Sequence, residues 1–194
     1  MIKETRYCLS HVTDFEGRDA RQTFWYYVLA LVLFQFVVGI LTSIPLVVSV
    51  FDTIFDAVEK GADPENMEAL VMASTADWVG TTVWVSAGAY LITAALFVAA
   101  FVRRLHDAGF AGYWATIPIV TQAVAVYYSF AQMDEVQRVM ASVSNPAELQ
   151  AMQAELSSNP GNYLSWLGYL VVVGFGVLKS QAGPNRYGEP PQER

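Results

Sequence analysis

The stretch Val102–Gly112, with the sequence VRRLHDAGFAG, places two arginines, a histidine and an aspartate between two long apolar runs. Residues 79–101 before it and residues 113–131 after it contain no Asp, Glu, Lys or Arg. An apolar run of about 18 or more residues predicts a membrane-spanning helix, because about 20 residues at 1.5 Å each cross a hydrocarbon core of about 30 Å. We therefore predict that this stretch is a short charged turn between two membrane helices.

The rest of the chain repeats this pattern. None of the 11 basic and 18 acidic residues falls in four apolar runs, at residues 24–51, 79–102, 113–131 and 163–178. Charged residues make up only 15% of the chain, whereas a soluble domain carries about 25%. Because backbone groups in lipid must be bonded internally, the runs are expected to be helices. The sequence predicts an all-α membrane protein: a four-transmembrane-helix bundle at residues 24–178, with a hydrophilic, amphipathic arm at residues 1–23 and an irregular tail at residues 179–194.

The distribution of Lys and Arg predicts the orientation. Nine of the 11 basic residues lie in the arm, the central stretch and the tail, and only Lys60 and Arg138 lie in the two long connections at residues 52–78 and 132–162. Basic residues favour the cytoplasmic side of a membrane protein. Both termini and the central stretch are thus expected inside. The two acidic connections are expected outside, and apolar residues at helical spacing in them predict short amphipathic helices.

Local signals refine this outline. Pro45 is expected to kink or end the first helix, and Asp63 followed by Pro64 is typical of a helix start. Four glycines are expected at turns in the cytoplasmic segments: Gly17, Gly109, Gly112 and Gly188. Gly109 is placed to end the second helix as its C′ residue.

The charged central stretch has a structural and a functional interpretation. In the structural one, Arg103 and Arg104 complement the negative pole of a helix and anchor the topology, and Asp107 is within pairing distance of Arg103. In the functional one, the basic residues bind an anionic headgroup or an acidic segment of a partner. A third reading takes His106 and Asp107 as a base with its orienting carboxylate.

Known catalytic and metal-binding patterns are missing from the sequence. The chain has a single cysteine, Cys8, and two histidines, His11 and His106. A metal site of three or four ligands would need both histidines and carboxylates from separate segments. No nucleophile elbow, P-loop or dinucleotide fingerprint occurs. We therefore predict no cofactor, no metal and no nucleic-acid partner.

Three motifs together carry a resemblance to a known family. They are FEGRDARQTFW at residues 15–25, RRLHDAGFAGYW at residues 103–114 and GPNRYGEPP at residues 183–191. The chain resembles a family of small bacterial inner-membrane proteins, the domain of unknown function 805. That resemblance implies a multi-pass protein of the bacterial inner (plasma) membrane with unassigned activity, and it supplies no catalytic residues.

The predicted topology brings all three motifs to the cytoplasmic side. We therefore hypothesise one cytoplasmic cluster with Glu16, Asp19 and Asp107 as internal partners, comprising Arg18, Arg21, Arg103, Arg104, His106, Asp107, Asn185 and Arg186. The expected function is a non-enzymatic membrane protein that binds anionic phospholipid or another membrane protein through this basic face. Two alternatives stay open: a subunit of a homo-oligomeric small-solute channel or transporter, and an interfacial membrane enzyme using His106 and Asp107.

Overall fold

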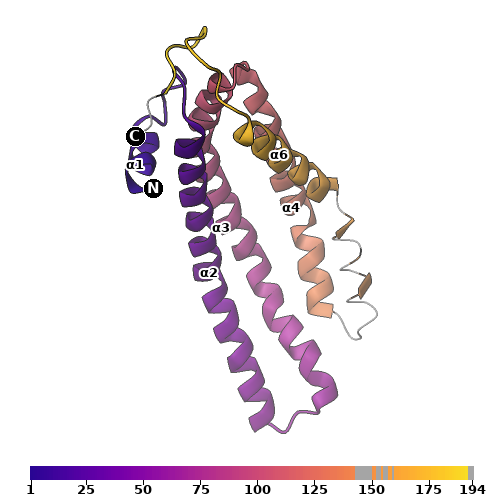
Figure 1. The fold of residues 1–194 in the computed structure, drawn as a ribbon. Coiled ribbons are helices and arrows are strands. Elements are labelled where there is room, and N and C mark those ends of the chain that lie inside the picture. Colours follow the sequence, from indigo (N-terminus) through magenta and orange to yellow (C-terminus); the bar gives the residue numbers. More distant parts are fainter. Residues whose placement is uncertain (143–149, 152–153, 155–156, 159, 192–194) are drawn as a thin grey trace. The chain divides into compact units, whose positions relative to one another are not determined.

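The computed structural model describes residues 1–142, 150–151, 154, 157–158 and 160–191. Helices dominate these residues, in the order α1 (Ile2–Ser10), α2 (Arg21–Glu59), α3 (Pro64–Asp107), the 3-10 helix η1 (Gly112–Ala115), α4 (Thr116–Ser142) and α6 (Pro160–Val177) (Figure 1). The predicted all-α fold is confirmed for this part of the chain. Two of its helices are long and apolar enough to cross a membrane, at Arg21–Glu59 and Ala69–Asp107, and Tyr163–Val177 is a shorter apolar helix.

The long helices extend beyond the predicted ends. The predicted helix at residues 24–51 is α2, which continues through Pro45 to Glu59, so this proline does not end the helix. The predicted helix at residues 79–102 is α3, which already begins at Pro64. A helix does start at this proline, but it is continuous with the apolar run instead of forming a separate outer helix. In the connection at residues 132–162, α4 continues from the apolar run to Ser142, so the first short helix expected there is not separate. A second one, expected around residues 149–156, falls largely outside the described residues.

The chain divides into two compact units, to which α2, α3 and α4 each contribute a part. The second unit comprises residues 37–88 and 125–162. In it, Trp84 and Phe130 pack edge to face, with ring centroids 4.7 Å apart. Gly61 has a φ of +67° in the connection between α2 and α3, which favours glycine. The Ala62 N–H donates to the Ala57 carbonyl at 2.9 Å and closes this turn.

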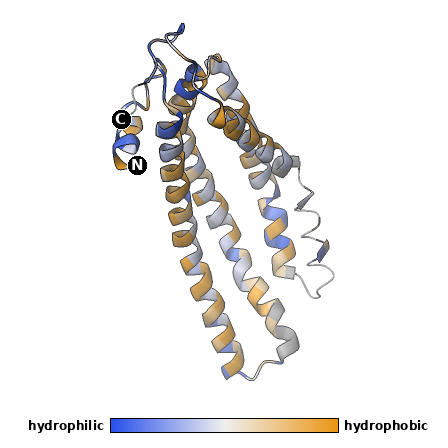
Figure 2. Ribbon diagram, in the orientation of Figure 1, coloured by the Kyte–Doolittle hydropathy of each residue, from blue (hydrophilic) through white to orange (hydrophobic). Residues whose placement is uncertain are grey.

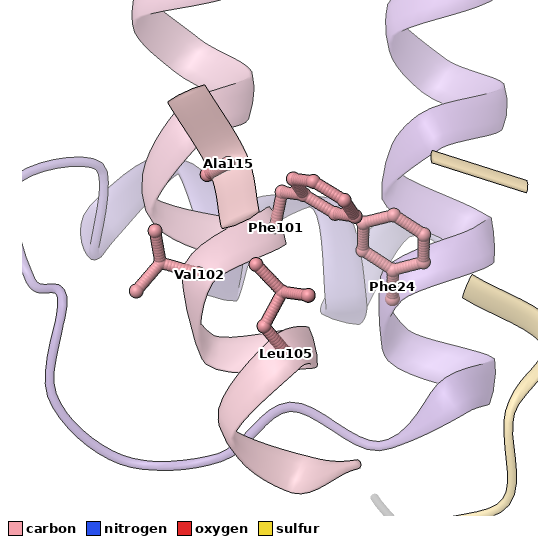
Figure 3. Close-up of a cluster of buried hydrophobic side chains, with 5 residues drawn as sticks. All are labelled: Phe24, Phe101, Val102, Leu105 and Ala115. Atoms are coloured by element: carbon pink, nitrogen blue, oxygen red, sulfur yellow. The ribbon is translucent and has the colours of Figure 1, made fainter. Parts of the chain in front are cut away.

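The first unit comprises residues 1–36, 89–124 and 163–194. Its core is the apolar group of Phe24, Phe101, Val102, Leu105 and Ala115 (Figure 3). The Phe101 ring stacks on the Phe97 ring, with the ring centroids 5.2 Å apart, and its centroid lies 5.9 Å from that of Phe24. Aromatic contacts therefore join the first turns of α2 to the last turns of α3.

Polar contacts and a close approach complete the packing of this unit. The amide of Gln35 donates to the Thr93 hydroxyl at 2.8 Å, and the Tyr27 hydroxyl donates to the Leu96 carbonyl at 3.0 Å. Both bonds join α2 to α3 and pair polar groups of two apolar helices with each other. On α6, a Cβ added to Gly168 would lie 2.3 Å from the Thr121 hydroxyl oxygen, so the glycine permits close packing on α4.

Candidate functional site: a buried arginine cluster

The charged central motif lies on a helix, not in a turn. Residues 103–107 form the last turn of α3, which ends at Asp107. Gly109 follows with a φ of +84°; its N–H donates to the His106 carbonyl at 3.1 Å, and the Phe110 N–H donates to the Leu105 carbonyl at 2.9 Å. This pair of bonds is the Schellman arrangement, with glycine at C′. The helix therefore fixes the directions in which the Arg, His and Asp side chains project.

Asp107 is at the centre of a set of buried charges. Its side chain is fully buried, and one carboxylate oxygen accepts from Arg18 Nε at 3.2 Å and Arg18 Nη2 at 3.1 Å. The other oxygen accepts from Arg104 Nη1 and from the Ser180 hydroxyl. A carboxylate has about four lone-pair sites, so these four donors occupy its accepting capacity.

Arg104 joins the end of α3 to the end of α6. Besides its pairing with Asp107, its Nε donates to the Gly176 carbonyl at 3.3 Å and its Nη2 donates to the Leu178 carbonyl. The last carbonyls of a helix have no partner within the helix and carry partial negative charge. Arg104 therefore caps α6 with a full positive charge, and it is itself completely buried.

Arg103 binds the N-terminal arm in a similar way. Its Nε donates to the Asp19 carboxylate at 2.9 Å, and its Nη1 donates to the carbonyls of His11, at 2.8 Å, and Asp14. His11 is the C-cap residue of α1, so this arginine caps a second helix end. The Asp19 N–H returns a bond to the Arg103 carbonyl at 3.2 Å. The pairing of Arg103 with Asp107 expected from their spacing is therefore wrong, because the two side chains pair with different partners.

Arg18 fixes the tail that follows α6. Its Nη2 donates to the Gln181 carbonyl at 2.7 Å, and its Nη1 donates to the carbonyls of Gly183, at 2.8 Å, and Gly188, at 3.3 Å. The Gln181 N–H donates to the Asp107 carbonyl at 2.9 Å. The tail thus wraps around one guanidinium group and rests on the end of α3.

We call the five side chains Arg18, Asp19, Arg103, Arg104 and Asp107 the arginine cluster. All five are buried. Three cations face only two carboxylates, so the cluster holds a formal charge of +1, and burying unpaired charge is expensive. Seven backbone carbonyl oxygens, from the arm, the end of α6 and the tail, accept bonds from the guanidinium groups and supply part of the remaining compensation, whereas Arg103 Nη2 is buried without a hydrogen-bond partner among the described residues. The cluster stabilises one arrangement of these three segments.

An aromatic stack extends the cluster at its edge. The His106 ring lies parallel to the Tyr187 ring, with the ring centroids 3.7 Å apart, and the Arg186 guanidinium carbon lies over the Tyr187 ring, 4.7 Å from its centroid. Asn185 donates to the His106 carbonyl at 3.0 Å, and a pair of backbone bonds between Asn185 and Gly188 closes a tight turn in the tail. The φ of +121° at Gly188 explains why this turn needs glycine.

The structure places the predicted site residues in three groups. Six of them make direct hydrogen bonds within the network that joins the arm, α3 and the tail: Arg18, Arg103, Arg104, His106, Asp107 and Asn185. Arg186 contacts Tyr187, and Arg21 is exposed in the first turn of α2. Among the expected internal partners, Asp19 and Asp107 pair with arginines, whereas Glu16 is exposed.

The four predicted turn positions need glycine for different reasons. Gly17 has a φ of +83°, and φ is also positive at Gly109 and Gly188. Gly112 does not; instead, an added Cβ would lie 2.9 Å from Val102 and 3.3 Å from His106 Nε2, so its role is close approach. Sequence reasoning missed Ser180, Gln181 and Tyr187. Only the turn-forming residues around Asn185 hinted that this tail segment has a fixed conformation.

His106 and Asp107 do not form a base with an orienting carboxylate. His106 Nδ1 lies 3.3 Å from the Gly17 carbonyl oxygen, and the Asp107 carboxylate is directed to Arg18, Arg104 and Ser180. General-base catalysis needs an available lone pair within reach of a substrate proton. With its oxygens occupied and its side chain buried, Asp107 is a structural residue.

A comparison with protein families agrees with the motifs in these segments. The family model described as a protein of unknown function (DUF805) matches residues 12–189, which cover most of the chain. The chain belongs to the DUF805 family. The matched range of this DUF805 protein includes every residue of the arginine cluster. No curated protein and no solved structure matches the chain.

Proposed function

We propose that this DUF805 protein is a non-enzymatic, multi-pass protein of the bacterial inner membrane that binds anionic phospholipid through its cytoplasmic face. In this proposal the apolar runs in α2, α3, α4 and α6 cross the bilayer four times. Both chain ends then lie in the cytoplasm.

The arginine cluster is the observation that carries the topology in this proposal. It ties the N-terminal arm, the last turn of α3 and the tail after α6 together at one end of the first unit. Three segments that are hydrogen-bonded to each other must lie on the same side of a membrane. Nine of the 11 basic residues belong to these segments, which supports the cytoplasm as that side.

The membrane-facing surface of the long helices supports the same proposal. Large apolar side chains along α2 are exposed, including Val32, Phe36 and Leu41. Figure 2 shows the hydrophobic colouring continuing along this helix. A soluble protein rarely exposes an apolar surface of this extent, and acyl chains would cover it.

Exposed bases, not the buried cluster, are the groups that would bind lipid. The guanidinium groups of Arg18, Arg103 and Arg104 are directed to internal acceptors and are buried. Among the described residues of the first unit, three acidic side chains are exposed, at residues 14, 16 and 189. Five basic side chains outside the cluster are exposed there: Lys3, Arg6, Arg21, Lys179 and Arg186. Each base near an anionic leaflet contributes about 1 kcal/mol of attraction.

Lipid retention tests the binding role. Protein purified in detergent with equal amounts of phosphatidylglycerol and phosphatidylcholine would be examined by native mass spectrometry. We expect the chain to retain phosphatidylglycerol preferentially. A variant with the five exposed bases changed to glutamine should lose this preference, whereas the matched control Lys60→Gln with Arg138→Gln, both in the second unit, should keep it.

Two outcomes would overturn the proposal. An unchanged lipid preference in the five-base variant would remove the lipid-binding role. If that variant instead lost a protein that co-purifies with the native chain, the same face would be assigned to a protein partner.

A reporter fused after Arg194 tests the topology separately: green fluorescent protein should fluoresce there, and alkaline phosphatase inserted at Gly61 should be active. Activity of the phosphatase at the C-terminus would exclude the proposed orientation.

A further inference from the structure

The short helix α1 packs against the long helices at a depth below their cytoplasmic ends. Its buried Cys8 belongs to an apolar group with Tyr27, Leu31 and Ala100, and Figure 1 shows α1 beside the first turns of α2. Tyr27 and Leu31 lie six and ten residues beyond Arg21, where α2 begins. At about 1.5 Å per residue these positions are about 9 and 15 Å along the helix axis.

This depth places α1 within the cytoplasmic leaflet when Arg21 is at the headgroups. The headgroup region on each side of a bilayer is about 5–8 Å thick, since the bilayer is about 40–45 Å across and its hydrocarbon core about 30 Å. A helix whose inner face packs into the buried group that contains Tyr27 and Leu31 therefore extends past the headgroups to the upper acyl chains. The surroundings of its outer face at this depth are lipid.

The outer face of α1 has two distinct stripes. Ile2 and Leu9 are 80% and 47% exposed, and since they are seven residues apart, two helical turns, they lie on the same side. Lys3 and Arg6 are also exposed and lie next to each other, three residues apart. An apolar stripe beside a basic stripe is the pattern of a helix that lies in the membrane interface.

We infer that α1 is an interfacial helix that inserts Ile2 and Leu9 among the acyl chains and directs Lys3 and Arg6 to anionic phosphates. Long basic side chains can extend along apolar surroundings to reach the headgroups. The inner face of the helix is held by Cys8 and by the capping of its end by Arg103. The helix therefore reaches the leaflet already positioned, without the ordering cost that a disordered arm would incur. This inference rests on the proposed membrane embedding and names the lipid-binding element.

Spin labels at single cysteines test the inference. The one native cysteine, Cys8, would be changed to alanine, and nitroxide labels would be placed at Leu9, at exposed Asp14 in the following loop and at Val32 on the outer side of α2. The full chain would be studied in nanodiscs of phosphatidylglycerol and phosphatidylethanolamine. We expect the labels at residues 9 and 32 to collide with oxygen more than with a water-soluble nickel complex, and the label at residue 14 to show the reverse.

The three labels separate this inference from the proposed function. A label at residue 9 that is as accessible to nickel as the label at residue 14, with residue 32 still in lipid, would overturn the interfacial helix and leave the membrane protein intact. A label at residue 32 that is accessible to nickel would contradict the membrane embedding itself. Should Cys8→Ala disturb α1, a label at Ile2 in a Cys8→Ser background gives the same comparison.

Discussion

The substitution Asp107→Asn tests the arginine cluster most directly. Asparagine keeps the size and shape of aspartate but replaces one carboxylate oxygen with an NH₂ group. One oxygen of Asp107 accepts from Arg18 and the other accepts from Arg104 and Ser180. In either orientation of the amide, its NH₂ group therefore faces the N–H or O–H groups that donated to the replaced oxygen, and these donors lose their acceptor.

The expected loss of stability is large because the site is fully buried. The substitution raises the formal charge of the cluster from +1 to +2, since three arginines then face only Asp19. Removing one partner of a buried ion pair costs about 3–5 kcal/mol. The loss should also loosen the tail, because the Ser180 hydroxyl donates to the Asp107 carboxylate and the same carboxylate holds Arg18, which donates to the Gln181 carbonyl.

Unfolding in mixed micelles measures this loss. The free energy of unfolding would be obtained by SDS titration of the native chain, Asp107→Asn and the matched control Glu16→Gln, which removes the same charge from an exposed side chain. The control should differ from the native chain by less than about 0.5 kcal/mol. An Asp107→Asn variant as stable as the control would refute the reasoning, since the buried ion pairs would then contribute nothing to the fold.

Three further predictions concern single positions, each measured by the same unfolding titration. Gly109→Ala should lower the free energy of unfolding by more than about 1 kcal/mol, because alanine is strained at a φ of +84° and its Cβ would lie 2.1 Å from the Gln181 side-chain nitrogen. A neutral result would show that the tail is not seated on α3. Gly168→Ala should destabilise the chain, whereas Gly174→Ala, with nothing within 4 Å of its added Cβ, should be neutral or stabilising; equal effects would contradict the close packing of α4 and α6. Arg104→Lys should cost about 1–3 kcal/mol, because one ammonium group cannot reach all the acceptors of the guanidinium; a fully stable lysine variant would show that charge alone suffices.

Helix α3 shows which features of the fold could be predicted from the sequence and which could not. Its apolar run, the glycine at its end and the charged motif between two runs could all be predicted, because hydropathy, turn preference and charge are properties of neighbouring residues. Its extension back to Pro64 was missed, since an acidic, partly polar segment adjoining an apolar run has no local signal that separates one continuous helix from two.

The amino-acid sequence by itself determined the helical class, the apolar segments, the positions of the turn glycines and the gathering of basic residues in three segments. Only the tertiary structure decided that Arg18, Arg103 and Arg104 are buried while Lys3 and Arg6 are exposed. The physical reason is that most acceptors of the three buried arginines are backbone carbonyls. Every residue carries a carbonyl, so no side-chain pattern reveals which ones a distant guanidinium will reach.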